Sequence, residues 1–452
     1  MIETEKISDL EKHLNNFNLH IRQSAFSELL QLTKMGKVDI KEGNLDINMH
    51  CHTFFSFNAY GYSPTSLVWL AKKNGWKMVG MVDFDVLDGI DEFLQACEIG
   101  EVRGTAGIET RVFIPEFSNR EINSPGEPGV AYHMGIGFSG TKVTSPATPI
   151  LKDLRNRAVH RNQMVIQRVN SILQPVTIDY ETDVLPLSPS ATPTERHIVL
   201  AYIRAVEKEI LNLTSFWSEK LQMTPDEITG LLTDSAKLQN QVRSKLMKRG
   251  GPGYVMPTPN TFPSVEEFHN LILECGALPC FAWLDGTSKG EEDIDELLEL
   301  MIDKGVVTVN IIPDRNWNIP DDTQRQKKVK NLNEFINLAQ KLDLPINVGT
   351  EMNSYGNKLV DDFKSPELAG FRSIFLAGAF FVYGHTMFER NLGLGYQSEW
   401  AQVNFPSRRQ SNDFYTRVGQ MIQPGEAGLN VLKKLNTNME PSSILRILEG
   451  TR

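Results

Sequence analysis

Two histidines separated by one residue are the feature of this sequence that points most directly to chemistry. His50 and His52 close the segment DINMHCH, in which polar and apolar residues alternate as they do in a β-strand. Side chains two residues apart on a strand point to the same face, so the two imidazoles can bind one ion. Cys51, between them, is expected to point to the opposite face. Because such a pair also occurs by chance, a metal site depends on what the neighbouring strands supply.

The strands that follow carry further side chains able to bind a metal ion, most of them at strand ends. They are Asp83 and Asp85 in VDFD, Glu109 in GIET, His133 in AYHMG and Glu351 in VGTE. The carboxyl ends of parallel strands meet at one edge of an α/β sheet or barrel, so we expect these groups to converge on the histidine pair. Mixed imidazole and carboxylate ligands suit Mn, Fe or Zn. The sequence therefore predicts a transition-metal centre.

Each of these residues also has a simpler interpretation. Asp83 or Asp85 could cap the helix that follows its strand. Glu109 could be a surface carboxylate, and His133 could be a hydrogen-bonded core histidine. The joint pattern favours the metal centre, because independent structural roles would not all fall at strand ends.

The segments that would position these residues alternate between strand and helix. Strands are predicted at 45–51, 77–83, 105–110, 131–138, 277–284, 306–312 and 345–351. Helices are predicted between them at 63–75, 90–100, 264–276, 292–305 and 327–343. The first of these helices has a proline in its first turn and a glycine at its end, both typical of helix boundaries. This order predicts an α/β fold with its site at the carboxyl ends of the strands.

The alternation is interrupted by a long helical stretch, which divides the chain into five parts. We expect an N-terminal helical extension at 1–44, with one helix over 8–35, and β/α parts at 45–140 and 261–400. Between them lies an inserted helical cap subdomain at 141–260, which ends in the Gly/Pro-rich loop GGPGYVMPTPNTFP. A C-terminal extension at 401–452 shows no clear period apart from a final helix near 442–448.

The bulk composition is that of an ordinary globular protein and excludes some partners. The 452 residues are 40% hydrophobic and 23% charged, and the net charge is −10. That charge argues against binding a long nucleic acid, whereas a small phosphorylated substrate needs only a local basic cluster and a metal ion. No apolar run has the length of a membrane span, so no membrane partner is expected. The four cysteines show no framework spacing, which favours free thiols in the cytoplasm.

Taken together, these motifs resemble the PHP (polymerase and histidinol phosphatase) superfamily. The order HCHT, VDFD, GIE, YHMG and GTEMN carries the resemblance, which covers roughly residues 45–140 and 260–355. It implies a distorted (β/α)7 TIM-like barrel with a metal cluster at the C-terminal rim. It also implies a hydrolase that acts on phosphoesters.

The helical insertion resembles that of the small-nucleotide phosphoesterases of this superfamily. Arg155, Arg157 and Arg161 lie on its first predicted helix, and Arg196 and His197 open the second. The resemblance implies that Arg196 and His197 contact the substrate phosphate, and guanidinium groups suit that task. Arg157 is a further candidate for substrate binding. Alternatively, these arginines could form a solvated helix face.

Three positions depart from the family pattern, where a histidine ligand is usual. Phe84, Trp283 and Asn353 stand in those places, and the first two cannot bind metal. The retained residues could complete the shell of one ion, with a second held weakly. The resemblance therefore implies a centre of one or two divalent transition-metal ions (Mn, Fe or Zn), not three.

Three functions remain open on the sequence. The first is a metal-dependent phosphoesterase in which metal-bound hydroxide attacks phosphorus and Asp83 and Asp85 are the candidate catalytic carboxylates. The second is a catalytically degenerate protein of this fold that binds a ligand or partner, since fold does not guarantee activity. The third is an amidohydrolase-type C–N hydrolase, although a neutral amide needs no cluster of guanidinium groups.

Overall fold

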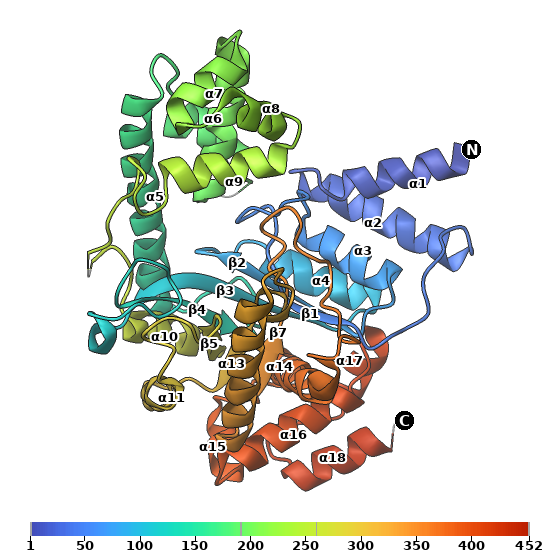
Figure 1. Cartoon of the computed structure of the whole chain (residues 1–452). Coiled ribbons are helices and arrows are strands. Elements are labelled where there is room, and N and C mark those ends of the chain that lie inside the picture. Colours follow the sequence, from blue (N-terminus) through green and yellow to red (C-terminus); the bar gives the residue numbers. More distant parts are fainter. Residues whose placement is uncertain (1, 190–191, 259, 451–452) are drawn as a thin grey trace.

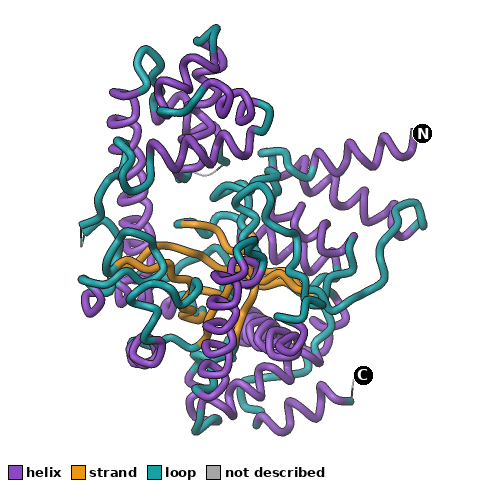
Figure 2. The backbone as a smooth tube through the Cα atoms, viewed as in Figure 1, coloured by secondary structure: helices purple, strands orange, loops and turns teal. Residues whose placement is uncertain are grey.

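The computed structural model describes residues 2–189, 192–258 and 260–450. Seven strands form one sheet in sequence order: β1 (Ile47–Cys51), β2 (Met78–Phe84), β3 (Gly104–Phe113), β4 (Val130–Ile136), β5 (Leu278–Trp283), β6 (Thr308–Ile311) and β7 (Ile346–Val348). The pairs are parallel except that β4 runs antiparallel to both β3 and β5. A bridge between Cys51 and Glu351 joins the two outer strands, so the sheet closes into a distorted barrel (Figures 1 and 2).

The seven strands correspond to the seven predicted from the sequence. β1, β6 and β7 are buried at every residue and the other four at all but one or two, as expected for strands covered on both faces. The α/β class and the distorted TIM-like barrel with an inserted helical subdomain are therefore confirmed. The four cysteines are free thiols, and Cys51 is fully buried with its Sγ toward the Asn48 carbonyl.

Helices cover the outside of the barrel, where the sequence predicts them. They are α3 (Pro64–Lys73), α4 (Ile90–Gly100), α10 (Val265–Glu274), α11 (Ile294–Asp303) and α13 (Asp322–Lys341), with the short α12 (Asp314–Trp317) after β6. Their starts follow ordinary capping chemistry: Ser63 caps α3, and Ser264 forms a capping box with Glu267 at α10. Among the described residues, no helix is long and apolar enough to cross a membrane.

The N-terminal extension differs from the prediction of one helix over 8–35. The structure has two helices, α1 (Ile2–His13) and α2 (Leu19–Lys34), which pack against each other. Asn18 ends the connection, because its side chain accepts a hydrogen bond from the His20 N–H and caps α2. The apolar period continues across the break, so periodicity alone did not reveal it.

The insertion forms a helical cap with a hydrophobic core of its own. Its helices are α5 (Ala147–Ile172), α6 (Glu195–Glu209), α7 (Leu213–Leu221), α8 (Pro225–Leu232) and α9 (Ser235–Leu246). Buried residues from Val165 to Met247 form a cluster separate from the barrel core, with Trp217 and Tyr202 among the largest. In Figure 1 these helices stand on one side of the sheet, at the end where β2 finishes.

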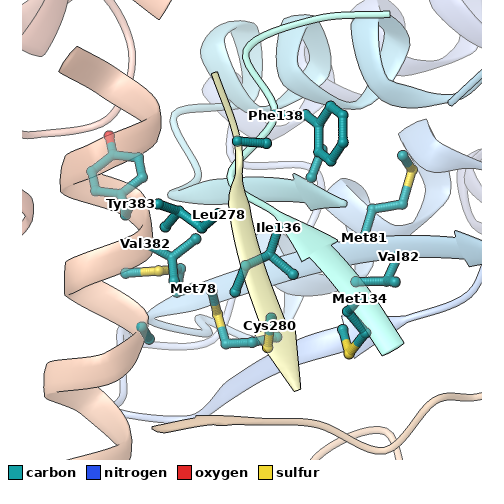
Figure 3. Packing of buried hydrophobic residues seen from close by; sticks show 14 of the residues in the cluster. Met78, Met81, Val82, Met134, Ile136, Phe138, Leu278, Cys280, Val382 and Tyr383 are labelled. Carbon is teal, nitrogen blue, oxygen red and sulfur yellow. The ribbon is translucent and has the colours of Figure 1, made fainter. Parts of the chain in front are cut away.

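A long buried helix, α14 (Arg372–Leu392), closes the opposite end of the barrel. Val382 and Tyr383 of this helix lie beside Met78, Ile136 and Leu278 (Figure 3). Met78 and Leu278 begin parallel strands, so α14 packs at the amino-terminal ends and leaves the carboxyl ends free. Three further helices, α15 (Glu399–Asn404), α16 (Arg408–Met421) and α17 (Glu426–Leu432), precede the predicted final helix, α18 (Pro441–Glu449).

The close contact between α14 and α16 provides a test of this packing. A Cβ atom added at Gly384 in α14 would lie 2.0 Å from the Tyr415 carbonyl oxygen in α16. The nearest atoms all belong to the α16 backbone, so no flexible side chain can move aside to make room. Gly384→Ala should therefore destabilise the protein by about 1–3 kcal/mol, measured by denaturant unfolding. The control is Gly230→Ala in α8, where an added Cβ atom would meet nothing within 4 Å. This variant should raise the free energy of unfolding by about 0.5–1 kcal/mol, because alanine favours a helix over glycine. Equal stability of the two variants would contradict the packing described.

Candidate metal centre and active-site cavity

A cavity of about 590 Å³ opens at the carboxyl ends of the strands, lined by residues of both the barrel and the cap. Its barrel side includes His50, His52, Glu109 and Glu351, and its cap side includes Arg196. Seven basic and five acidic side chains line it, although the whole chain has a net charge of −10. The cavity is thus locally basic in an acidic protein, which favours an anionic ligand.

Three predicted ligands converge at the base of this cavity. Nε2 of His50 and Nε2 of His52 lie 3.5 Å and 3.2 Å from Oε2 of Glu109, and all three side chains are buried. The histidines share a face because they are two apart at the end of β1, and β3 presents Glu109 to it. Within the described ranges, these are the only three His, Cys, Asp or Glu residues that meet closely enough to hold one ion.

The hydrogen bonds of the two imidazoles leave both Nε2 lone pairs facing the carboxylate. Nδ1 of His50 donates to Oδ1 of Asn310 (3.0 Å) and Nδ1 of His52 donates to Oγ of Ser56 (2.9 Å), since that hydroxyl donates its own hydrogen to Asp83. Among the described residues, neither Nε2 has a hydrogen-bond partner. A divalent metal ion would satisfy all three buried ligand atoms at once, so the donor set fits such an ion.

The charges of this group respond to one another. Burial opposes protonation of His50, but the Glu109 carboxylate outweighs it and raises the pKa of that histidine. Burial also works against ionisation of Glu109, yet His50 and His52 hold its pKa well below its usual range. The carboxylate is therefore ionised at neutral pH, as a metal ligand must be.

Asp83 is placed behind the centre, outside the cavity lining. Its carboxylate accepts hydrogen bonds from the Thr53 N–H (2.7 Å), the Thr53 hydroxyl (2.6 Å) and the Ser56 hydroxyl (2.6 Å). Burial raises its pKa despite these donors. The contacts give Asp83 a positioning role for His52 through Ser56, instead of the catalytic role predicted from the sequence.

Asp85, the other predicted catalytic carboxylate, does line the cavity. It accepts a hydrogen bond from the Thr110 hydroxyl (2.5 Å) and pairs with Nη2 of Arg161 at 3.3 Å. Burial raises its pKa, although Arg161 acts against this. Its φ of 63° is rare for a residue with a side chain, and such strain is common at functional sites.

Glu351 also reaches the cavity, but its carboxylate is paired with a cation. Its backbone is bonded twice to the end of β1: the Glu351 N–H donates to the His50 carbonyl, and the His52 N–H donates to the Glu351 carbonyl. The side-chain Oε2 accepts a hydrogen bond from Nη2 of Arg315 at 2.5 Å. The predicted ligand Glu351 is therefore beside the centre and engaged by Arg315.

The structure does not bring His133 to the predicted metal centre. Its neighbour Tyr132 lines the cavity, so alternation along β4 points His133 to the other face of the sheet. There its Nε2 lies 2.6 Å from Nε2 of His269 on α10, and burial lowers its pKa well below the usual value. The core-histidine interpretation describes this residue better than the ligand interpretation.

Of the three predicted substrate-binding residues, Arg196, His197 and Arg157, only Arg196 lines the cavity. His197 is buried, accepts a hydrogen bond from the Thr194 N–H at 2.9 Å, and has a pKa lowered to about 3 by burial. Arg157 donates to the Phe262 carbonyl at 2.7 Å and pairs with Asp153 on its own helix. These contacts give both residues structural roles, because their side chains do not line the cavity.

Arg196 differs from the other arginines of the cavity. It donates to the Asn240 side chain at 3.2 Å, and in the described part of the chain it has no carboxylate partner. Burial and the nearby Arg243 lower its pKa to about 10, so it remains charged at neutral pH. A half-buried guanidinium that lines a cavity and has no carboxylate partner among the described residues is well suited to bind an anion.

Most of the basic lining was not predicted from the sequence. Arg111 pairs with Glu127 at 2.8 Å, and Arg243 pairs with Glu195 at 2.5 Å. Arg111 could have been found, because it lies two residues after Glu109 on the same strand and so shares its face. Arg243 has no such signal, since α9 meets the cavity only through the packing of the cap.

The three residues at which the sequence departs from the pattern it resembles all line the cavity. Phe84 contacts Tyr132 edge to face, and Trp283 stacks on Phe335 with ring centroids 4.4 Å apart. Asn353 is the third. These positions supply two aromatic rings and an amide to the cavity lining, and no imidazole.

Comparisons with known proteins give only distant structural likenesses. No family model and no curated protein matches the chain. One similar solved structure is an amidohydrolase from Chromobacterium violaceum with bound sulfate and no metal: 16% identity, TM-score 0.48, covering 71% of this chain and 93% of that one. Another, from Bifidobacterium adolescentis, is provisionally described as a metal-dependent phosphoesterase: 19% identity, TM-score 0.45, covering 73% and 97%. We draw nothing on function from likenesses at this level.

The donor set can be tested by metal titration. His52→Ala removes a ligand and should abolish measurable Mn²⁺ binding. Ser56→Ala removes only the hydrogen-bond acceptor that orients His52, so the affinity for Mn²⁺ should fall about 10–100-fold. Isothermal titration calorimetry on metal-free protein measures both. Ser171→Ala, at an exposed hydroxyl on α5, is the control and should bind like the wild type. Unchanged Mn²⁺ affinity in His52→Ala would show that the ligands are assigned wrongly.

Proposed function

We propose that this protein is a metal-dependent hydrolase of a small phosphorylated substrate, with its ion held by His50, His52 and Glu109. The observation that supports this most is the pair of buried, unpartnered Nε2 atoms facing a carboxylate at the base of a basic cavity. A divalent ion bound there would supply a Lewis acid and lower the pKa of a water molecule toward neutrality.

The side chains of the cavity would then share the work on a phosphoester. Arg196 binds the phosphoryl oxygens, because its guanidinium is charged and has no carboxylate partner in the described part of the chain. Asp85 can hold or release a proton near the reacting group, since burial raises its pKa and Thr110 and Arg161 fix its position. Phe84 and Trp283 contact the rest of the substrate and exclude water.

A second candidate is a binding protein of this fold without catalysis. It is favoured by Phe84 and Trp283, which put aromatic rings where the family resemblance implies ligands. The C–N hydrolase is less favoured, because seven basic side chains around the cavity serve no purpose for a neutral amide. Binding of metal and phosphate without turnover would select the binding protein.

Phosphate release from a panel of phosphomonoesters and phosphodiesters tests the proposal. We expect turnover by the Mn²⁺-loaded protein, its loss on chelation and its recovery on adding Mn²⁺. Arg196→Met should raise KM about 10–100-fold, as expected for the loss of a charge-assisted contact of about 1.5–3 kcal/mol, with the bound metal unchanged. Arg204→Met, on the exposed side of α6, is the matched control. An unchanged KM in Arg196→Met would remove the cap from substrate binding.

A further inference from the structure

We propose that the centre holds a single divalent ion and that Arg315 supplies the second positive charge beside it. In this arrangement Glu351 serves as the partner of Arg315 and not as a metal ligand. The inference rests on the proposed function, and it specifies how a site with few ligands could still bind a doubly charged phosphoryl group.

Glu351 is held beside the three converging ligands by its backbone. Its backbone is fixed against β1 on both sides, by bonds to the His50 carbonyl and from the His52 N–H. Its side chain therefore lies next to the three ligands, and it is nearly buried, with 10% of the side chain exposed. Its carboxylate does not join the three ligand atoms that converge. Instead, Oε2 of Glu351 accepts a hydrogen bond from Nη2 of Arg315 at 2.5 Å.

Arg315 is held at the cavity by the short helix α12. It belongs to α12, which follows β6, the strand that carries Asn310 and so orients His50. The Asn316 side chain ties this turn to the carbonyls of Leu284 and Ile312. The Arg315 side chain is 45% exposed and lines the cavity, so it pairs with Glu351 and still has surface open to a ligand.

The remaining cavity residues near the barrel offer few ligands for a second ion. Phe84 offers only carbon atoms, and the indole of Trp283 is fixed by stacking on Phe335. Asn353 offers a neutral amide oxygen, which is a weak ligand for a transition metal. With Glu351 paired to Arg315 and Asp85 paired to Arg161, a second ion would have to share Glu109, and among the described residues no second group of three His, Cys, Asp or Glu side chains converges.

A guanidinium group can take the place of a second metal ion in binding a phosphoryl group. In two-metal phosphatases the second ion neutralises charge on the phosphoryl oxygens. A guanidinium carries a permanent charge and can bind two such oxygens at once, so Arg315 can meet the same need without a ligand shell. Arg196 lies close enough to interact with both Arg315 and Glu351, which places the two arginines on one part of the cavity.

The test replaces the ion pair by a neutral pair, Arg315→Met with Glu351→Gln. Mn²⁺ titration of metal-free protein should give one ion per chain in the wild type and in the double variant, with Kd values within about threefold. Inorganic phosphate should bind the Mn²⁺-loaded double variant at least tenfold more weakly, because the second charge is gone. The control is Arg120→Met with Glu296→Gln, an ion pair outside the cavity.

Two results would overturn the inference. If Glu351 is a ligand, the double variant should lose Mn²⁺ affinity by more than about 100-fold, beyond what loss of an orienting group causes. Two bound ions in the wild type, seen as a spin-coupled Mn²⁺ signal by electron paramagnetic resonance, would also overturn it and need no variant. A wild type that binds no Mn²⁺ would instead overturn the proposed function itself.

Discussion

The structure depends on one electrostatic constraint: two imidazole lone pairs and a carboxylate oxygen meet in a buried place. Nε2 of His50, Nε2 of His52 and Oε2 of Glu109 converge there, and among the described residues neither imidazole nitrogen has a hydrogen-bond partner, so a cation between them would satisfy all three. Asn310 and the Ser56–Asp83 pair hold the imidazoles in this orientation from behind. The closure of the barrel serves the same end, because β1 is bonded to the Glu351 segment on one side and to β2 on the other. The buried polar groups are best explained as a prepared site for a metal ion.

The charges around this centre divide the cavity into paired and unpaired cations. Arg111, Arg161 and Arg243 each have a carboxylate partner, so they give the cavity shape more than free charge. Arg196 has no such partner in the described part of the chain, and Arg315 is open on one side of its pair with Glu351. An anion would therefore be drawn to the part of the cavity that these two arginines share. This division explains how an acidic protein can offer a site for a phosphorylated molecule.

The sequence predicted those parts that follow from short-range geometry. The strands, and with them the convergence of His50, His52 and Glu109, follow from the period of two and from the common edge of parallel strands. His133 was misplaced because β4 runs antiparallel and the period puts Tyr132, not its neighbour, in the cavity. The helix over 8–35 was drawn through Asn18, where a cap interrupts a continuous apolar period. The role of Arg315 could not be predicted, since its pairing with Glu351 joins α12 to the segment after β7, and only the closed barrel brings these together.

The most direct test of this account is the metal content per chain of wild-type protein, purified without chelator and without a histidine tag, by inductively coupled plasma mass spectrometry. The account predicts one tightly held divalent transition-metal ion for each chain. Protein that carries no metal and takes up none of Mn, Fe or Zn on reconstitution would contradict it. The buried group of His50, His52 and Glu109 would then need another explanation, and the binding-protein alternative would lead.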